Sequence, residues 1–195
     1  MNKYVIKIFA FALLTFVLGI SQSCKTGALG GKETSAEDLK VLDSIYQLDN
    51  YRIEIDVVYP FNTLATTQVA NDLLWNTGNN ASRIDVRADG NYILIRNDSL
   101  TGYLPFFGER RLNGGDISGR NSAIQFDEFI NNLNKSINKK KNRVELNFTA
   151  KQKEGDNDKY DTKIYIYPNK SVLVDISPVY RTFMKYEGRL VEITE

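Results

Sequence analysis

The chain contains no histidine and only one cysteine among its 195 residues. Ser-His-Asp and Cys-His mechanisms and the usual zinc sites are therefore excluded, because each needs an imidazole that exchanges protons or binds metal near neutral pH. A single cysteine cannot form a disulfide within the chain, so the stability of the fold must come from its core. Carboxylates, Lys, Tyr and Ser remain as the side chains available for chemistry.

Neither sign of charge is in excess, since 25 Lys and Arg residues stand against 24 Asp and Glu residues. Without Lys3 and Lys7 of the N-terminal segment, the remainder carries 23 basic and 24 acidic residues, a net charge of −1. Domains that bind nucleic acid are expected to be basic. We therefore expect no nucleic-acid partner.

The N-terminal segment is typical of a secretory signal peptide. Lys3 and Lys7 precede an apolar run from Ile8 to Ile20. At about 13 residues, this run is shorter than the ~20 residues that a membrane-spanning helix needs. It is followed by small or polar residues and by the single cysteine, in the word Ser21-Gln22-Ser23-Cys24.

This word resembles a bacterial lipobox in its looser form; the alternative is an ordinary signal peptide with an incidental cysteine. A lipobox predicts a thioether between Cys24 and diacylglycerol, cleavage after Ser23 and acylation of the new amine. Each buried methylene contributes about 0.8 kcal/mol, so several acyl chains anchor a protein stably. We expect a signal peptide at 1–23, a lipidated flexible tether at 24–34 and a single β domain with an N-terminal helix at 35–195.

The start of this domain is predicted to be a short helix. Ser35 and Asp38 resemble a capping box. Apolar residues follow at helical spacing, namely Leu39, Leu42, Ile45 and Tyr46. Beyond the helix, Tyr51–Tyr59 alternates apolar and charged residues, which is typical of a half-buried strand, and Pro60 ends the alternation.

The segment Arg83–Gly108 is expected at the centre of the fold. Its three apolar runs are separated by Asp89-Gly90 and Asn97-Asp98, and Asp-Gly between extended runs is a strong hairpin signal. Pro105 cannot donate to a neighbouring strand, which predicts an edge strand or a bulge there. Five further β-rich segments follow, at 122–130, 143–151, 159–167, 171–176 and 182–191. They predict an all-β antiparallel meander forming a small barrel or sandwich, and we favour a lipocalin-like barrel.

Five words in these segments carry a family resemblance: Gly90-Asn91-Tyr92, Tyr103-Leu104-Pro105-Phe106-Phe107-Gly108, Ala123-Ile124-Gln125-Phe126, Ile166-Tyr167-Pro168-Asn169-Lys170-Ser171 and Tyr186-Glu187-Gly188-Arg189-Leu190. They resemble the DUF4251 domain of small lipoproteins from Bacteroidota, a family of unknown function. The resemblance covers about Tyr51 to Ile193, with Phe106 where Tyr is commoner and Lys170 in place of a Gly. It implies an all-β domain on a lipid anchor, and it supplies no catalytic residue.

Aromatic residues supply the candidate ligand-binding site. Tyr103, Phe106 and Phe107 stand close together in the most distinctive word of the chain. They could line a ligand cavity, because small barrels hold one small molecule in their mouths. The alternative is that these residues fill the core.

Acidic clusters are the next candidate sites. Asp127 and Glu128 could serve as a hydrolytic pair, but neighbouring strand residues point to opposite faces. Asp156, Asp158 and Asp161 offer oxygen ligands for calcium, although their spacing lacks the Gly and the distal Glu of an EF-hand loop. We expect no metal site, no cofactor and no catalytic residue.

Two weaker patterns concern the surface. A basic run could meet anionic head groups or protect a strand end from pairing with other chains, and it comprises Lys135, Lys139, Lys140, Lys141 and Arg143. The words Asp43-Ser44-Ile45 and Asp98-Ser99-Leu100 resemble a short acceptor motif for protein O-glycosylation.

Together these patterns predict a binding or accessory module of the cell envelope, which holds a small apolar ligand or a protein partner. We expect an outer-membrane lipoprotein attached through lipid on Cys24. Lys25, Thr26 and Gly27 follow the cysteine in place of the acidic residues of some surface-exposed lipoproteins, which favours the periplasmic face. A structural or assembly lipoprotein without a pocket is the alternative. A hydrolase with paired carboxylates ranks third, because no nucleophile and base are recognised.

Overall fold

The computed structural model describes residues 34–195 except 62, 64–66, 69–70, 73, 75, 111–122, 131, 154–157, 192 and 194–195. The predicted signal peptide, the lipidation site Cys24 and Asp156 of the acidic trio lie outside the described residues. Among the described residues, no helix is both long enough and apolar enough to cross a membrane.

The predicted N-terminal helix is confirmed as α2 (Ala36–Tyr46). Ser35 Oγ accepts a hydrogen bond from the backbone N–H of Asp38 at 3.0 Å, which satisfies one of the donors left open by the first turn. Glu37 and Asp38 lie in that turn, where their charge complements the helix dipole. Leu42 and Ile45 are buried, so the helix packs through the face that the apolar spacing indicates.

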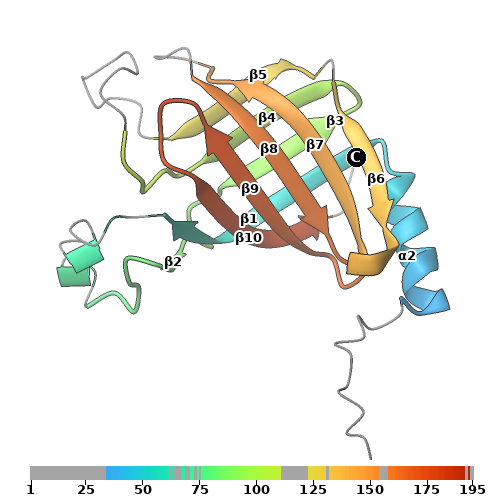
Figure 1. Ribbon diagram of the computed structural model, residues 1–195, viewed down its shortest axis with the longest axis horizontal. Helices are drawn as coiled ribbons and strands as arrows, with labels where there is room; N and C mark the ends of the chain where they lie inside the picture. Colours follow the sequence, from blue (N-terminus) through green and yellow to red (C-terminus); the bar gives the residue numbers. More distant parts are fainter. Residues whose placement is uncertain are drawn as a thin grey trace, which may run out of the picture. The chain divides into compact units, whose positions relative to one another are not determined.

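The strands form one antiparallel sheet in the order β5-β4-β3-β1-β10-β9-β8-β7-β6, with β2 also paired to β1. Their bounds are β1 Asn50–Pro60, β2 Ile84–Asp85, β3 Tyr92–Arg96, β4 Ser99–Leu104, β5 Ile124–Phe129, β6 Asn134–Asn138, β7 Arg143–Lys151, β8 Lys159–Ile166, β9 Ser171–Pro178 and β10 Met184–Val191. Figure 1 shows the sheet curling around the core with α2 beside β6. The all-β class with a short N-terminal helix is confirmed.

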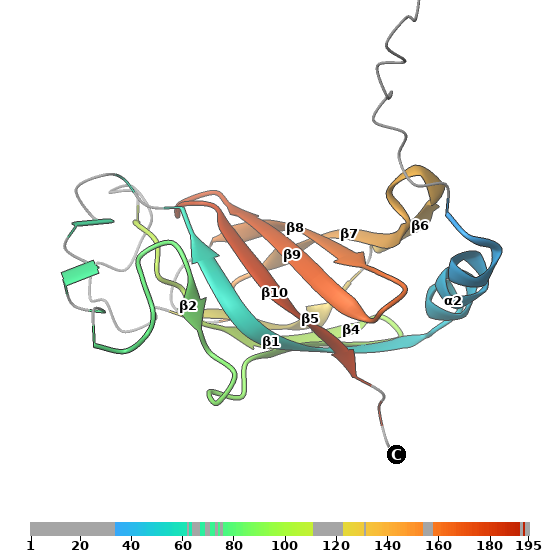
Figure 2. The same cartoon turned by 90° about the horizontal axis from the view of Figure 1, so that it is seen from below.

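The sheet consists of two meanders that are joined by the pairing of β1 with β10. Strands β3 to β5 follow one another on one side of β1, and β6 to β10 follow one another on the other (Figure 2). The end of β7 that extends past β6 approaches the other meander, because the N–H of Lys153, just beyond β7, donates to the carbonyl of Gln125 in β5 at 2.9 Å. The sheet is therefore a curled half-barrel and not a sandwich of two sheets.

Inward-facing side chains fill this curled sheet as one hydrophobic cluster, to which Leu42 and Ile45 of α2 also belong. Tyr160 and Tyr186 are completely buried within it. The rings of Phe126 and Tyr160 meet edge to face, with centroids 5.7 Å apart. Aromatic rings thus pack among the aliphatic side chains inside the sheet.

The expected Asp89-Gly90 hairpin is wrong. β2 and β3 do not pair with each other, because both bond to the same edge of β1, β2 at Val57–Val58 and β3 at Asn50–Glu54. The segment between them is an insertion in one interrupted strand. Gly90 still adopts the positive φ of 69° that Asp-Gly favours.

Two other strand expectations also change. Pro105 follows the last residue of β4, an internal strand between β3 and β5, so this proline ends a strand and creates neither an edge nor a bulge. The edge strand β6 has the sequence NKSIN and was not predicted. One apolar residue in five leaves no alternation to detect, and polar residues are typical of an edge that must not pair with other chains.

An ion pair is buried within the core. Asp158 and Arg181 are 0% and 1% exposed, and Arg181 Nε lies 3.4 Å from Asp158 Oδ2. The other carboxylate oxygen of Asp158 accepts backbone hydrogen bonds from Lys159, Val179 and Tyr180 at 3.0–3.1 Å. The guanidinium of Arg181 stacks 5.2 Å from the ring centroid of Phe106. This carboxylate thus fixes the loop between β9 and β10 to the start of β8.

We expect Asp158→Ala to lower the free energy of unfolding by about 3–5 kcal/mol, because the buried Arg181 would lose its counter-charge. The measurement is equilibrium unfolding in urea. Asp127→Ala is the matched control, because Asp127 pairs with Lys153 at an exposed position, where an ion pair contributes at most about 1 kcal/mol. Equal losses in the two variants would contradict the role assigned to Asp158.

Candidate functional site

Two hollows adjoin β1, one at its beginning and one near its middle. The first, called the apolar groove here, has a volume of about 630 Å³. It lies between the end of α2, the start of β1, the β8–β9 turn and the end of β10. Its lining residues are Val41, Ser44, Ile45, Gln47, Leu48, Asp49, Asn50, Lys170, Leu190, Val191 and Ile193.

Helical spacing builds one wall of the apolar groove. Val41, Ser44 and Leu48 follow each other at three- and four-residue steps, so they line one flank of α2 and of the residues after it. Leu48 is 39% exposed. The opposite wall is the end of β10, where the N–H of Leu190 donates to the carbonyl of Lys170 at 2.9 Å.

The C-terminal end of α2 is held in place by two side chains from the sheet. Tyr51 Oη donates to the carbonyl of Ile45 at 3.0 Å, and Lys135 Nζ donates to the carbonyl of Leu48 at 2.8 Å. Burial, together with the nearby Asp49 charge, raises the pKa of Tyr51 to about 12, so its hydroxyl keeps its proton and remains a donor. These bonds fix the wall of the apolar groove.

The second hollow, called the charged hollow, has a volume of about 230 Å³ on the outer face of the sheet. It occurs where both edges of β1 depart from regular pairing. The register of β1 and β10 shifts between Ile55 and Val57, next to Gly188. A Cβ at position 188 would lie 2.0 Å from the carbonyl oxygen of Glu54, so only glycine allows this approach.

On the other edge of β1, the inserted segment between β2 and β3 borders the charged hollow. The N–H of Val86 donates to the carbonyl of Asp56, and the N–H of Ile55 donates to the carbonyl of Asn91. Asn91 is 3% exposed and closes the insertion by donating its side-chain amide to the carbonyl of Val86 at 3.4 Å. Bulges and insertions of this kind re-aim side chains.

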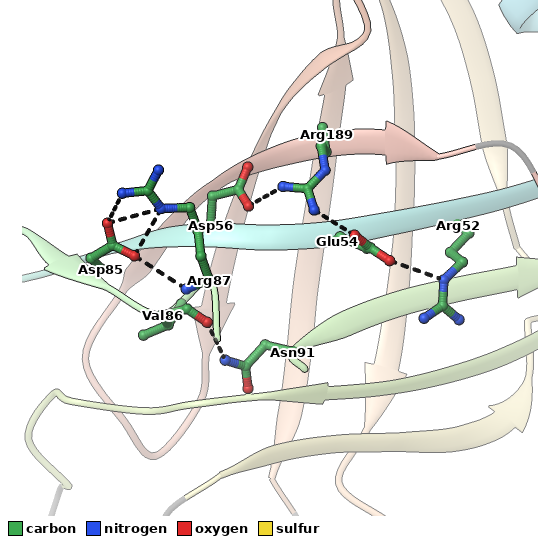
Figure 3. Close-up of polar contacts among 8 residues, drawn as sticks. All are labelled: Arg52, Glu54, Asp56, Asp85, Val86, Arg87, Asn91 and Arg189. Carbon is green, nitrogen blue, oxygen red and sulfur yellow. Dashed lines mark hydrogen bonds and ion pairs between the residues drawn. The ribbon is translucent and has the colours of Figure 1, made fainter. Parts of the chain in front are cut away.

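A chain of ion pairs crosses the charged hollow (Figure 3). Arg189 bridges two carboxylates of β1, with one guanidinium nitrogen 2.6 Å from Glu54 and the other on Asp56. Arg52 lies 3.6 Å from the other oxygen of Glu54. Arg87, on the insertion, lines the hollow and forms an ion pair with Asp85. The three arginines share the lining of the hollow with Glu54 and Asp56, whereas Asp85, the partner of Arg87, lies outside that lining.

The structure separates the three predicted ligand-binding residues. Phe106 is 9% exposed and belongs to the core, where it stacks on Arg181. Tyr103 and Phe107 are 47% and 41% exposed. None of the three lines the apolar groove or the charged hollow. Strand parity already separates Tyr103 from its buried neighbour Leu104.

The acidic candidates are also dispersed. Asp127 pairs with Lys153 at 2.7 Å, and Glu128 accepts from the backbone N–H of Lys151. Asp158 points into the core, whereas Asp161 is exposed and bonds to Thr149. Among the described residues, no group of three metal-ligating side chains comes together.

The basic run is split by its contacts. Lys135 contacts Leu48, whereas Arg143 pairs with Glu145 at 2.7 Å and stacks on Tyr165 at 3.7 Å. Lys139–Lys141 forms a short 3₁₀ turn between β6 and β7.

Of the two glycosylation candidates, Ser44 is exposed on α2, and Ser99 is the half-buried first residue of β4. The arginines of the charged hollow were not singled out from the sequence. The alternation in Tyr51–Tyr59 could have indicated them, because it places Arg52, Glu54 and Asp56 together on the outward face of one strand.

The family model of DUF4251, described as a domain of unknown function, matches residues 33–190. The chain belongs to this family. The DUF4251 match begins just before α2 and ends within β10, so it spans both hollows apart from the last residues of the apolar groove. No curated protein and no solved structure matches the chain. The lipocalin-like barrel therefore stays a prediction.

We expect the pKa of Asp85 to be about 2, because the side chain and the backbone N–H of Arg87 both hydrogen-bond to its carboxylate, and to rise part of the way towards about 3.9 in Arg87→Gln, which keeps the backbone bond. A carboxyl group whose pKa is lower in the folded than in the unfolded state stabilises the fold at pH values above the unfolded-state pKa. This contribution is lost as the pH falls from about 4 to about 2. Titration followed by NMR of the side-chain carboxyl measures the shift. Lys163→Gln, on β8, is the control, and an unchanged pKa in Arg87→Gln would contradict the pairing.

Proposed function

We propose that this DUF4251 chain is a lipid-anchored binding module of the cell envelope that holds a small apolar ligand in the apolar groove. The observation that carries the proposal is the groove itself. At about 630 Å³, it falls within the 300–1,000 Å³ typical of small-molecule sites. Such sites combine a mostly apolar lining with a few polar groups that orient the ligand.

The lining of the groove fits an amphiphile with one polar end. Its apolar side chains come from three separate elements, with Val41 on α2, Leu48 before β1 and Val191 at the end of β10. Lys170 and Asp49 add one charge of each sign. A fatty acid meets these conditions, because its chain needs an apolar wall and its carboxylate a cationic partner.

The location of the module is proposed from the sequence. The lipobox-like word ending in Cys24 supports a lipid anchor, and the Gly-rich tether from 24 to 34 supports a domain that moves freely near the membrane. We place the protein at the outer membrane on the periplasmic face, since no acidic residue follows the cysteine directly.

A structural or assembly role without a ligand is the second candidate. The tightly filled interior favours it, because the curled sheet packs Tyr160, Tyr186 and Phe106 where a ligand carrier of the barrel type would be hollow. The two candidates differ in whether the apolar groove is occupied.

We expect Cys24→Ala to release the protein from the membrane fraction into the soluble periplasmic fraction, since lipid on this residue would be the anchor. Cell fractionation with detection by antibody measures the distribution. Ser44→Ala, on the surface of α2, is the control and keeps the cysteine. A Cys24→Ala protein that remains as firmly membrane-bound as the parent would disprove the anchor.

We expect the unlipidated Cys24→Ala chain to bind cis-parinaric acid, with fluorescence that rises as the polyene enters the groove. Adding Val41→Gln and Leu48→Gln should weaken binding about tenfold or more, because two apolar side chains of one groove wall become polar. Val179→Gln is the matched control, an equally apolar residue that is 50% exposed and outside the groove. If the groove variant and Val179→Gln bind cis-parinaric acid equally well, the apolar groove is not the binding site, and the structural role is favoured.

A further inference from the structure

The outer face of the sheet presents a row of side chains that the apolar groove does not use. Successive pairings bring Arg189 opposite Glu54, Glu54 opposite Tyr92, Tyr92 opposite Tyr103, and Tyr103 opposite Gln125. We call these five residues the outer row. They lie on five neighbouring strands, from β10 to β5, at the same level of the sheet.

The outer row points away from the core. Its neighbours along the strands, such as Ile53, Ile93 and Leu104, are completely buried, so parity places the row on the opposite face. Tyr103 is 47% exposed, and the side chain of Arg189 is 51% exposed. With about 4.8 Å between strands, the row spans roughly 19 Å, and the charged hollow adjoins its β10 and β1 end.

The side chains at this end are held in place before any ligand arrives. Arg189 is fixed between Glu54 and Asp56, and Arg52 lies between Glu54 and the ring of Tyr92, with its guanidinium 5.2 Å from the ring centroid. Side chains that are already ordered lose less conformational entropy on binding. The hollow of about 230 Å³ has the volume of about seven or eight water molecules, which is the scale of one sugar ring.

The charge of the site indicates a neutral ligand. Each arginine of the hollow is already paired with a carboxylate, so an anion would have to displace a carboxylate and a cation would have to displace an arginine. The same groups offer both donors and acceptors. A ligand whose hydroxyls donate and accept at once matches this mixture, and the exposed Tyr103 ring offers an apolar surface for the C–H face of a sugar.

The backbone at this site excludes an added strand. β1 is bonded to β10 on one edge and to β2 and β3 on the other, so it has no open edge on which a peptide could form main-chain hydrogen bonds. Recognition must come from side chains alone. We propose that the outer row and the charged hollow form a binding site for a neutral glycan that crosses β10, β1, β3, β4 and β5.

The test is affinity gel electrophoresis of the full chain in Triton X-100, with gels that contain a β-glucan, dextran, a mannan, a xylan or a galactan. At least one of these neutral polysaccharides should retard the protein. Tyr103→Ala should weaken that retardation about fivefold or more, because the aromatic surface is lost. Phe129→Ala is the matched control, an aromatic residue of β5 that is 75% exposed and lies outside the row.

Three results would overturn the proposal. They are no retardation by any of the five polysaccharides, equal effects of Tyr103→Ala and Phe129→Ala, and retardation by polygalacturonate alone that fades with salt, which would mean an anion site. Binding of cis-parinaric acid is measured on the Tyr103→Ala chain as well, and it should not change. The outcome for the glycan site is thus separate from the outcome for the apolar groove.

Discussion

The pairing of β1 with β10 is the constraint on which the structure depends. These two strands join the meander of β3 to β5 to the meander of β6 to β10, and without their ladder there would be two separate small sheets. The ladder holds although its register shifts between Ile55 and Val57. Gly188 makes that shift possible, since the backbone of Glu54 occupies the space of any larger residue.

Both hollows are consequences of this central strand. At the start of β1, the chain arrives from α2 and leaves a gap between the helix and the end of β10, which is the apolar groove. In the middle of β1, the shifted register on one edge and the insertion on the other open the charged hollow. One strand therefore gives the domain an apolar groove and a charged hollow with separate linings.

Local sequence patterns predicted most helices and strands. They did not predict which strands pair or which charged residues are buried. Ser35 and the alternation of Tyr51–Tyr59 act through neighbouring residues, so α2 and β1 were predicted. Asp89-Gly90 fixes the conformation of a turn but not which strand bonds to which, and β1 competes successfully for both flanking segments. Nothing in the residues next to Arg181 indicates that a charged side chain is buried there, and only its contact with the distant Asp158 explains the burial.

The position of β10 also has a consequence for how the chain folds. β1 and β10 are separated by more than a hundred residues, and closing so long a loop is slow compared with forming the hairpins on either side. Until β10 arrives, one edge of β1 exposes unpaired backbone groups that invite pairing with other chains. The sheet therefore cannot close until β10, the last of its strands along the chain, has paired with β1.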